Sequence, residues 1–179
     1  MRHLQEPGLA EAEMEGDVAR ALGGFLWLLS GERPAKGRSI KGMPAEMMVP
    51  RVGGFAAALP EAIGRPAWLT EKELGTYVKT FARSGFRGGL NWYRNIDRNW
   101  ELGRPYKGAK IGVPALFLAG DQDVVPQCPG MDCLIAALPT SVPLLKNIIS
   151  LPGCGHWTQQ ERPQEVNEAL IAFVRSLGP

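Results

Sequence analysis

The sequence predicts an α/β protein in two parts, a helix- and loop-rich region at residues 1–106 and a segment of parallel sheet at 107–179. Two observations carry this prediction. The first region shows helical periodicity broken by prolines and lacks strand-like runs. The second region alternates short apolar runs with helical patterns, as in strand–helix units of a parallel sheet.

The first region is predicted to hold three helices around a long loop. Residues 9–29 begin acidic and end apolar, which favours one helix. Residues 30–66 are rich in proline and predict a loop. A capping box, Thr70 to Glu73, begins a helix that Gly85 ends. A further helix is expected at 91–102, with an apolar face formed by residues spaced i, i+3 and i+7: Tyr93, Ile96 and Trp100.

The second region predicts strand, helix, strand and helix in turn. The strands are expected at Val113–Leu118 and Asn147–Leu151, the first of them buried on both faces. Met131–Leu138 has a helical pattern, and Pro163 is suited to the first turn of the last helix. Two strands have too few neighbours to form a stable parallel sheet, so this region predicts that further strands are missing.

Composition excludes several classes of function. The net charge is only +2, which gives no reason to expect a nucleic-acid partner. Two histidines and no Cys-x-x-Cys pair make a metal site unexpected, and no cofactor is predicted. No segment is apolar and long enough to span a membrane. Three irregularly spaced cysteines and no leader peptide predict a cytoplasmic protein.

Acid and imidazole groups follow the two predicted strands. Asp121 and Asp123 come directly after the first strand, and His156 follows the second in Cys154-Gly-His-Trp157. Ligands bind beyond the carboxyl ends of parallel strands, so these side chains are candidates for an acid–imidazole pair that activates water. The aspartates also suit a turn, and the spacing does not decide which of them is the partner.

No nucleophile accompanies this pair. The strand-to-helix elbow Gly-x-Ser-x-Gly is absent, and no serine lies in such a context. Two cysteines follow the aspartates, Cys128 and Cys133, but neither opens a helix from a sharp turn. The sequence therefore predicts a catalytic base and its acidic partner but no nucleophile.

Several long motifs resemble soluble epoxide hydrolases of the α/β-hydrolase fold, in the family's order. They are Gln5-Glu-Pro-Gly-Leu-Ala-Glu-Ala-Glu13, Ser84-Gly-Phe-Arg-Gly-Gly-Leu-Asn-Trp-Tyr-Arg-Asn-Ile-Asp-Arg-Asn-Trp100, Val113-Pro-Ala-Leu through Asp123, and Gly155-His-Trp-Thr-Gln159. The resemblance implies that residues 1–106 are the helical lid and 107–179 a C-terminal core segment with the last two strand–helix units. It implies a small-molecule epoxide as substrate and a vicinal diol as product.

The resemblance also implies residue roles. His156 matches the base that activates water, Asp123 its acidic partner, and Tyr93 one of two lid tyrosines that donate to the epoxide oxygen. Four further side chains are expected to line the substrate pocket: Trp92, Ile96, Trp100 and Trp157.

The sequence departs from the family in its first half. The other lid tyrosine and the nucleophilic aspartate have no match here, because the resemblance begins in the middle of the lid. We expect a truncated epoxide hydrolase that is inactive alone. The alternatives are a non-enzymatic remnant that pairs with the missing N-terminal half or with an intact homologue, and a related hydrolase such as a dehalogenase.

Overall fold

The computed structural model describes residues 2–33, 49–50, 52–59 and 64–178. The chain divides into two compact units. The first unit combines Met1–Leu28 with Ala45–Lys107, and the second combines Leu29–Pro44 with Gly108–Pro179. Residues 29–33 therefore join the later part of the chain, whereas the sequence boundary at 106/107 assigned them to the earlier part. The assignment of the two parts as lid and core stays a prediction.

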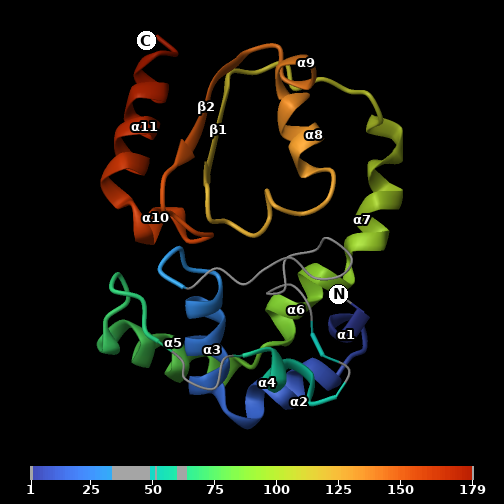
Figure 1. The fold of residues 1–179 in the computed structure, drawn as a ribbon. Coiled ribbons are helices and arrows are strands. Elements are labelled where there is room, and N and C mark those ends of the chain that lie inside the picture. Colours follow the sequence, from blue (N-terminus) through green and yellow to red (C-terminus); the bar gives the residue numbers. More distant parts are fainter. Residues whose placement is uncertain (1, 34–48, 51, 60–63, 179) are drawn as a thin grey trace. The chain divides into compact units, whose positions relative to one another are not determined.

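The first unit is helical in its described residues (Figure 1). A small core of buried side chains holds it together: Ala10, Met14, Ala21, Leu22, Phe86 and Leu90. Its elements are α1 (Arg2–Gln5), α2 (Leu9–Gly16), α3 (Val18–Leu28), α4 (Gly54–Ala58), α5 (Glu71–Ser84), α6 (Arg87–Arg94), α7 (Ile96–Gly103) and the 3₁₀ turn η2 (Arg104–Tyr106).

The single helix predicted over residues 9–29 is two helices. Asp17 interrupts it with a non-helical backbone conformation, φ −150° and ψ 86°. Its carboxylate accepts a hydrogen bond of 2.9 Å from the backbone N–H of Arg20, so the side chain caps the start of α3. Aspartate favours such a cap over the interior of a helix, which explains the break.

Acidic side chains of α2 bind other elements of the first unit. Glu13 accepts a hydrogen bond of 2.6 Å from the backbone N–H of Phe55 in α4. Glu15 accepts one of 3.1 Å from the N–H of Phe86, directly before α6. The sequence had assigned these carboxylates to the N-terminus of their own helix. Instead they satisfy unpaired N–H groups at the starts of two neighbouring helices.

The predicted signals around α5 are confirmed, whereas the next helix differs. Thr70 caps α5 and forms the capping box with Glu73, and Gly85 follows its last turn with φ 68°. The helix predicted over 91–102 is divided at Asn95 into α6 and α7. The Asn95 side chain donates to the carbonyl of Asn91, in competition with the regular helical bonds.

The second unit contains two parallel strands, β1 (Ala115–Gly120) and β2 (Leu145–Leu151). Between them the chain forms α8 (Met131–Ala136) and α9 (Leu138–Ser141), and after them α10 (Thr158–Glu161) and α11 (Pro163–Arg175). Figure 1 draws the strands between α8 and α11. Val166 of α11 packs on Leu151 and Cys154, and Pro163 occupies the first turn as predicted.

The sheet is less buried than the sequence predicted. Only Gly120 of β1 is fully buried, and the middle of β2 is exposed. Among the described residues no third strand pairs with either edge. Large apolar side chains of this unit are consequently exposed: Val113, Leu134, Ile148, Leu170, Ile171 and Val174.

Candidate functional site

An imidazole and a carboxylate meet beyond the ends of the two strands. His156 Nδ1 lies 3.0 Å from Asp123 Oδ1. An ionised carboxylate only accepts, so Nδ1 carries the proton and donates it. The Asp123 side chain is 11% exposed and that of His156 is 37% exposed, so the acid is buried while the ring remains accessible to water. No bond joins Nε2 to another described residue.

The turn after β1 distinguishes the two aspartates. Asp123 Oδ1 also accepts from the backbone N–H of Val125 at 3.0 Å, which fixes the carboxylate toward the histidine. Asp121 instead accepts a bond of 2.8 Å from the N–H of Gly153 and is exposed. Asp121 therefore ties two loops together, and Asp123 is the partner of the imidazole.

Close backbone packing holds the loop that carries His156. Its N–H donates to the carbonyl of Leu29 at 2.9 Å. A Cβ at Gly155 would meet backbone atoms of Gly31 and lie 2.5 Å from Leu29 O. Only glycine lets the two segments approach this closely. This contact was not predictable from the sequence, because a periodicity pattern contains no information about contacts between segments more than a hundred residues apart.

The surroundings favour the protonated imidazole. The hydrogen bond to Asp123 raises the pKa of His156 above its usual 6.5, against the opposing effect of burial. The charges of Asp123 and Glu161 raise it further. The ring of Trp157 lies edge-on to the imidazole, with centroids 5.2 Å apart. This arrangement suits a base that takes a proton from water and is stabilised as the imidazolium.

The thiols near this pair are poor nucleophiles. Burial raises the pKa of Cys154 to about 11, and burial with the charge of Asp123 raises the pKa of Cys128. A thiol with a raised pKa is little ionised near neutral pH. Among the described residues, no three acidic, cysteine or histidine side chains form a group able to hold a metal ion.

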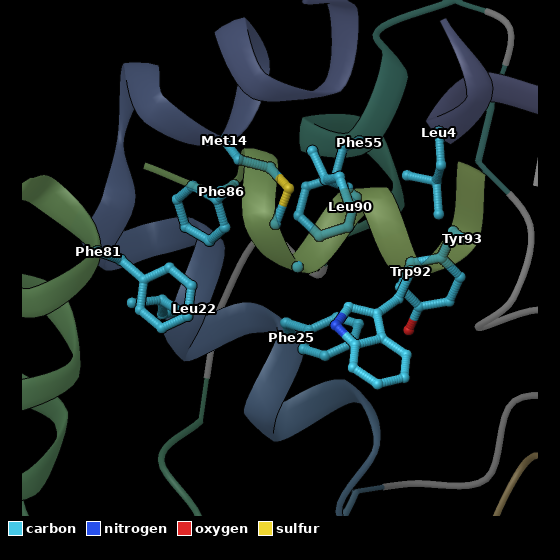
Figure 2. A pocket seen from close by; sticks show the side chains of 11 residues that line it. Leu4, Met14, Leu22, Phe25, Phe55, Phe81, Phe86, Leu90, Trp92 and Tyr93 are labelled. Carbon is cyan, nitrogen blue, oxygen red and sulfur yellow. The ribbon is translucent and has the colours of Figure 1, made fainter. Parts of the chain in front are cut away.

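The first unit holds an apolar pocket of about 500 Å³ (Figure 2). Trp92 and Tyr93 lie beside each other at one side of it, and Phe81 and Phe86 lie toward the other. The remaining lining is almost wholly apolar: Leu4, Met14, Leu22, Phe25, Phe55, Gly89 and Leu90. Such a pocket suits an uncharged, apolar ligand.

Tyr93 is held by contacts from the N-terminal residues. Gln5 donates to the Tyr93 carbonyl at 2.8 Å. The neighbouring Arg94 forms two bonds to Glu11, of 2.6 and 2.8 Å, and a third to the carbonyl of Leu4. The hydrogen bond from Arg94 lowers the pKa of Glu11 to about 2. This bidentate pair fixes the end of α6 that carries Tyr93.

Two predicted pocket residues are not among those that line the apolar pocket with Tyr93. Ile96 and Trp100 belong to α7, beyond the break at Asn95, so the predicted face shared with Tyr93 is not formed within one helix. Trp100 lines a separate hollow beside Arg104, whose guanidinium carbon lies 5.8 Å from the indole centroid. The expectation that Ile96 and Trp100 line a substrate pocket stays a prediction.

In the part of the chain that the structure describes, no helix has the length and apolar character needed to cross a membrane.

Comparison with known proteins shows a long match to epoxide hydrolases. Epoxide hydrolase A of Mycobacterium tuberculosis is 44% identical over 98% of this chain, which covers 51% of that protein. No family model matches. Two solved structures match nearly the whole of this chain, and the match covers 51% of each of those proteins. One is an epoxide hydrolase from an endophytic Streptomyces, with 40% sequence identity and a TM-score of 0.86. The other is potato (Solanum tuberosum) epoxide hydrolase I, with 31% sequence identity and a TM-score of 0.81.

The chain thus resembles epoxide hydrolases of the α/β-hydrolase fold almost end to end and spans about half their length. The predicted fold class and the resemblance stated from the motifs are confirmed.

Proposed function

We propose that this chain supplies the water-activating half of an epoxide hydrolase, with His156 as the base and Asp123 as its orienting acid. The main support for this proposal is the 3.0 Å hydrogen bond between these two side chains, in a chain that matches an epoxide hydrolase over 98% of its length. Each partner follows one of two adjacent parallel strands, where α/β proteins bind their ligands.

The proposed chemistry is hydrolysis of an ester formed between a carboxylate nucleophile and the opened epoxide. His156 Nε2 takes a proton from water while the water oxygen bonds to the ester carbonyl carbon. The bond from that carbon to the alkoxy oxygen then breaks, and the alkoxy oxygen receives the proton. The products are a vicinal diol and a carboxylic acid, which releases the second proton of the water to solvent and so restores the carboxylate. Asp123 holds the imidazole with Nε2 unprotonated before the step and stabilises the imidazolium during it.

Tyr93 is proposed to act in the preceding step. Ring opening develops negative charge on the epoxide oxygen, and a phenol O–H is a suitable donor to it. Tyr93 lines the apolar pocket beside Trp92, so we propose that the pocket receives an aryl or branched alkyl substituent of the epoxide. A halide leaving group needs no donor to oxygen, so this tyrosine favours an epoxide over a haloalkane substrate.

Ester formation needs a nucleophile that nothing in these 179 residues matches. We therefore propose that it comes from another segment, in the same polypeptide or in a partner. The 179 residues alone are expected to give no turnover of styrene oxide. Diol formation by this chain, lost on His156→Ala, would contradict that expectation.

A chimera tests the proposed role. The part of M. tuberculosis epoxide hydrolase A matched by this chain is replaced with the 179 residues, and diol formation from styrene oxide is measured. His156→Ala is expected to reduce turnover by about 10²–10⁴-fold. Tyr93→Phe should lower it, whereas the matched control Tyr77→Phe should not. Full turnover in the His156→Ala chimera would exclude the proposed base.

The exposed apolar surface of the second unit supports a second candidate, a binding partner of an intact homologue. Apolar side chains on α8, β2 and α11 are exposed, and both sheet edges lack a partner strand among the described residues. Open edges favour pairing with another chain. Size-exclusion chromatography with light scattering tests this candidate, because a monomer that also fails to bind an epoxide hydrolase would exclude it.

A further inference from the structure

One carboxylate accepts hydrogen bonds from three backbone N–H groups around the histidine loop. Glu161 is the last residue of α10, and its side chain is half-buried. Its Oε2 accepts from Gly31 and from Gly155, both at 2.9 Å. Its Oε1 accepts from Trp157 at 3.1 Å. Gly31 is 130 residues away along the chain, so the contact joins distant segments.

These donors lie on both sides of His156. Gly155 precedes it and Trp157 follows it, while the N–H of His156 itself bonds to the carbonyl of Leu29. All three N–H groups from 155 to 157 are thus hydrogen-bonded. Glu161 accepts from the first and the third, and the second donates to Leu29, two residues before the Gly31 that Glu161 also binds. Bonds between a charged acceptor and N–H groups are stronger than neutral ones, so one carboxylate restricts the backbone from 155 to 157.

We propose that Glu161 is a positioning residue for the catalytic pair: its three backbone hydrogen bonds fix the loop so that the His156 ring reaches Asp123. The alternative is a purely structural carboxylate that stabilises the fold without affecting the imidazole. The two differ in the titration of His156. The groups that act on this titration are Asp123 and Glu161, both acidic, and both raise the pKa.

Glu161→Gln separates charge and bonding from side-chain size. An amide presents one oxygen and one NH₂ group, so at least one of the three backbone donors loses its acceptor. We expect the pKa of His156 to fall and amide exchange at Gly155 or Trp157 to rise at least tenfold. Both are measured by NMR on the full chain, from the imidazole Cε1–H shift against pH and from amide exchange rates.

Glu165→Gln is the matched control. It removes the same charge four residues later, from an exposed side chain that accepts no hydrogen bond from the described residues. Glu165→Gln should change neither the pKa of His156 nor the amide exchange rates at Gly155 and Trp157. Unchanged His156 titration and amide exchange in Glu161→Gln would overturn the proposal, as would equal effects in both variants.

Glu161→Asp covers the case in which the glutamine variant does not fold. It keeps the charge but is one methylene shorter, so faster exchange at one or more of the three amides is expected. Unchanged exchange there would also overturn the proposal. The importance of Glu161 for catalysis rests on the proposed function. The two NMR readouts need no turnover, however, so failure of the positioning role is distinguishable from failure of the reaction.

Discussion

His156 Nδ1 and Asp123 Oδ1 lie 3.0 Å apart although the residues are separated by 33 positions in the sequence. Parallel strands explain the contact. β1 and β2 are adjacent and in register from Leu116 to Gly120, so the loops after their carboxyl ends begin side by side. The acid at the first end and the imidazole at the second therefore meet without any further element between them.

Replacing the acid should lower the pKa of the imidazole. The bond to Asp123 is the largest cause of the raised pKa of His156. In Asp123→Asn the pKa is expected to fall toward the usual 6.5, as measured by NMR titration. The neutral ring is the active base. The rate of the water-activating step in the chimera with Asp123 intact should therefore rise with pH, with a midpoint above 6.5. Asp121→Asn is the control, and an equal fall in that variant would contradict the assignment of the pair.

The Glu11–Arg94 pair predicts acid sensitivity of the first unit. The pKa of Glu11 is lowered from 4.5 to about 2, so its contribution to stability is complete above pH 4.5 and is lost as pH falls toward 2. Urea unfolding at pH 6, 4 and 3 should show this loss in the wild type and a smaller one in Glu11→Gln.

The exposed pair Arg98–Glu101 provides the control for this experiment. Both of its side chains are more than half exposed, and such pairs contribute less than about 1 kcal/mol. Glu101→Gln should therefore alter stability several times less than Glu11→Gln at pH 6. Comparable losses in the two variants would exclude a special role for the pair beside Tyr93.

Gly155→Ala should destabilise the second unit. The added Cβ would press against backbone atoms of Leu29, Ser30 and Gly31, in the segment to which the His156 N–H donates at the Leu29 carbonyl. Crowding of this kind costs about 1–3 kcal/mol. Gly112→Ala is the control, because a Cβ there meets nothing within 4 Å. Thermal unfolding by circular dichroism compares the two, and equal melting temperatures would contradict the close packing.

Filling the apolar pocket should weaken binding of an apolar ligand. Gly89 lines the pocket, and a Cβ there meets nothing within 4 Å, so Gly89→Leu starts a side chain from open space at the pocket wall. We expect the Kd for 1-phenyl-1,2-ethanediol, followed by tryptophan fluorescence, to rise at least tenfold, corresponding to about 1.4 kcal/mol. Gly88→Leu, on the same helix but outside this pocket, is the control and should leave the Kd unchanged.

Local sequence signals determined much of this protein by themselves. The capping box at Thr70, the glycine at 85 and the proline at 163 act within one helical turn, and each marks its helix end as predicted. The two strands were also recognisable, within a few residues of their bounds. His156 and Asp123 could be chosen as candidates because each directly follows a strand, and motifs across the chain indicated the epoxide hydrolase resemblance.

The tertiary structure alone decided which groups meet across long distances. Glu161 binds Gly31 over 130 residues, and Arg94 binds Glu11 over 83. Residue spacing leaves Asp121 and Asp123 equal and the family motifs imply Asp123, whereas the structure shows the physical reason: Asp123 faces the imidazole, and Asp121 accepts from Gly153. Such contacts depend on the path of the whole chain. Local pattern reports only whether a residue is apolar, charged or suited to a turn, so it identifies the candidates but not their partners.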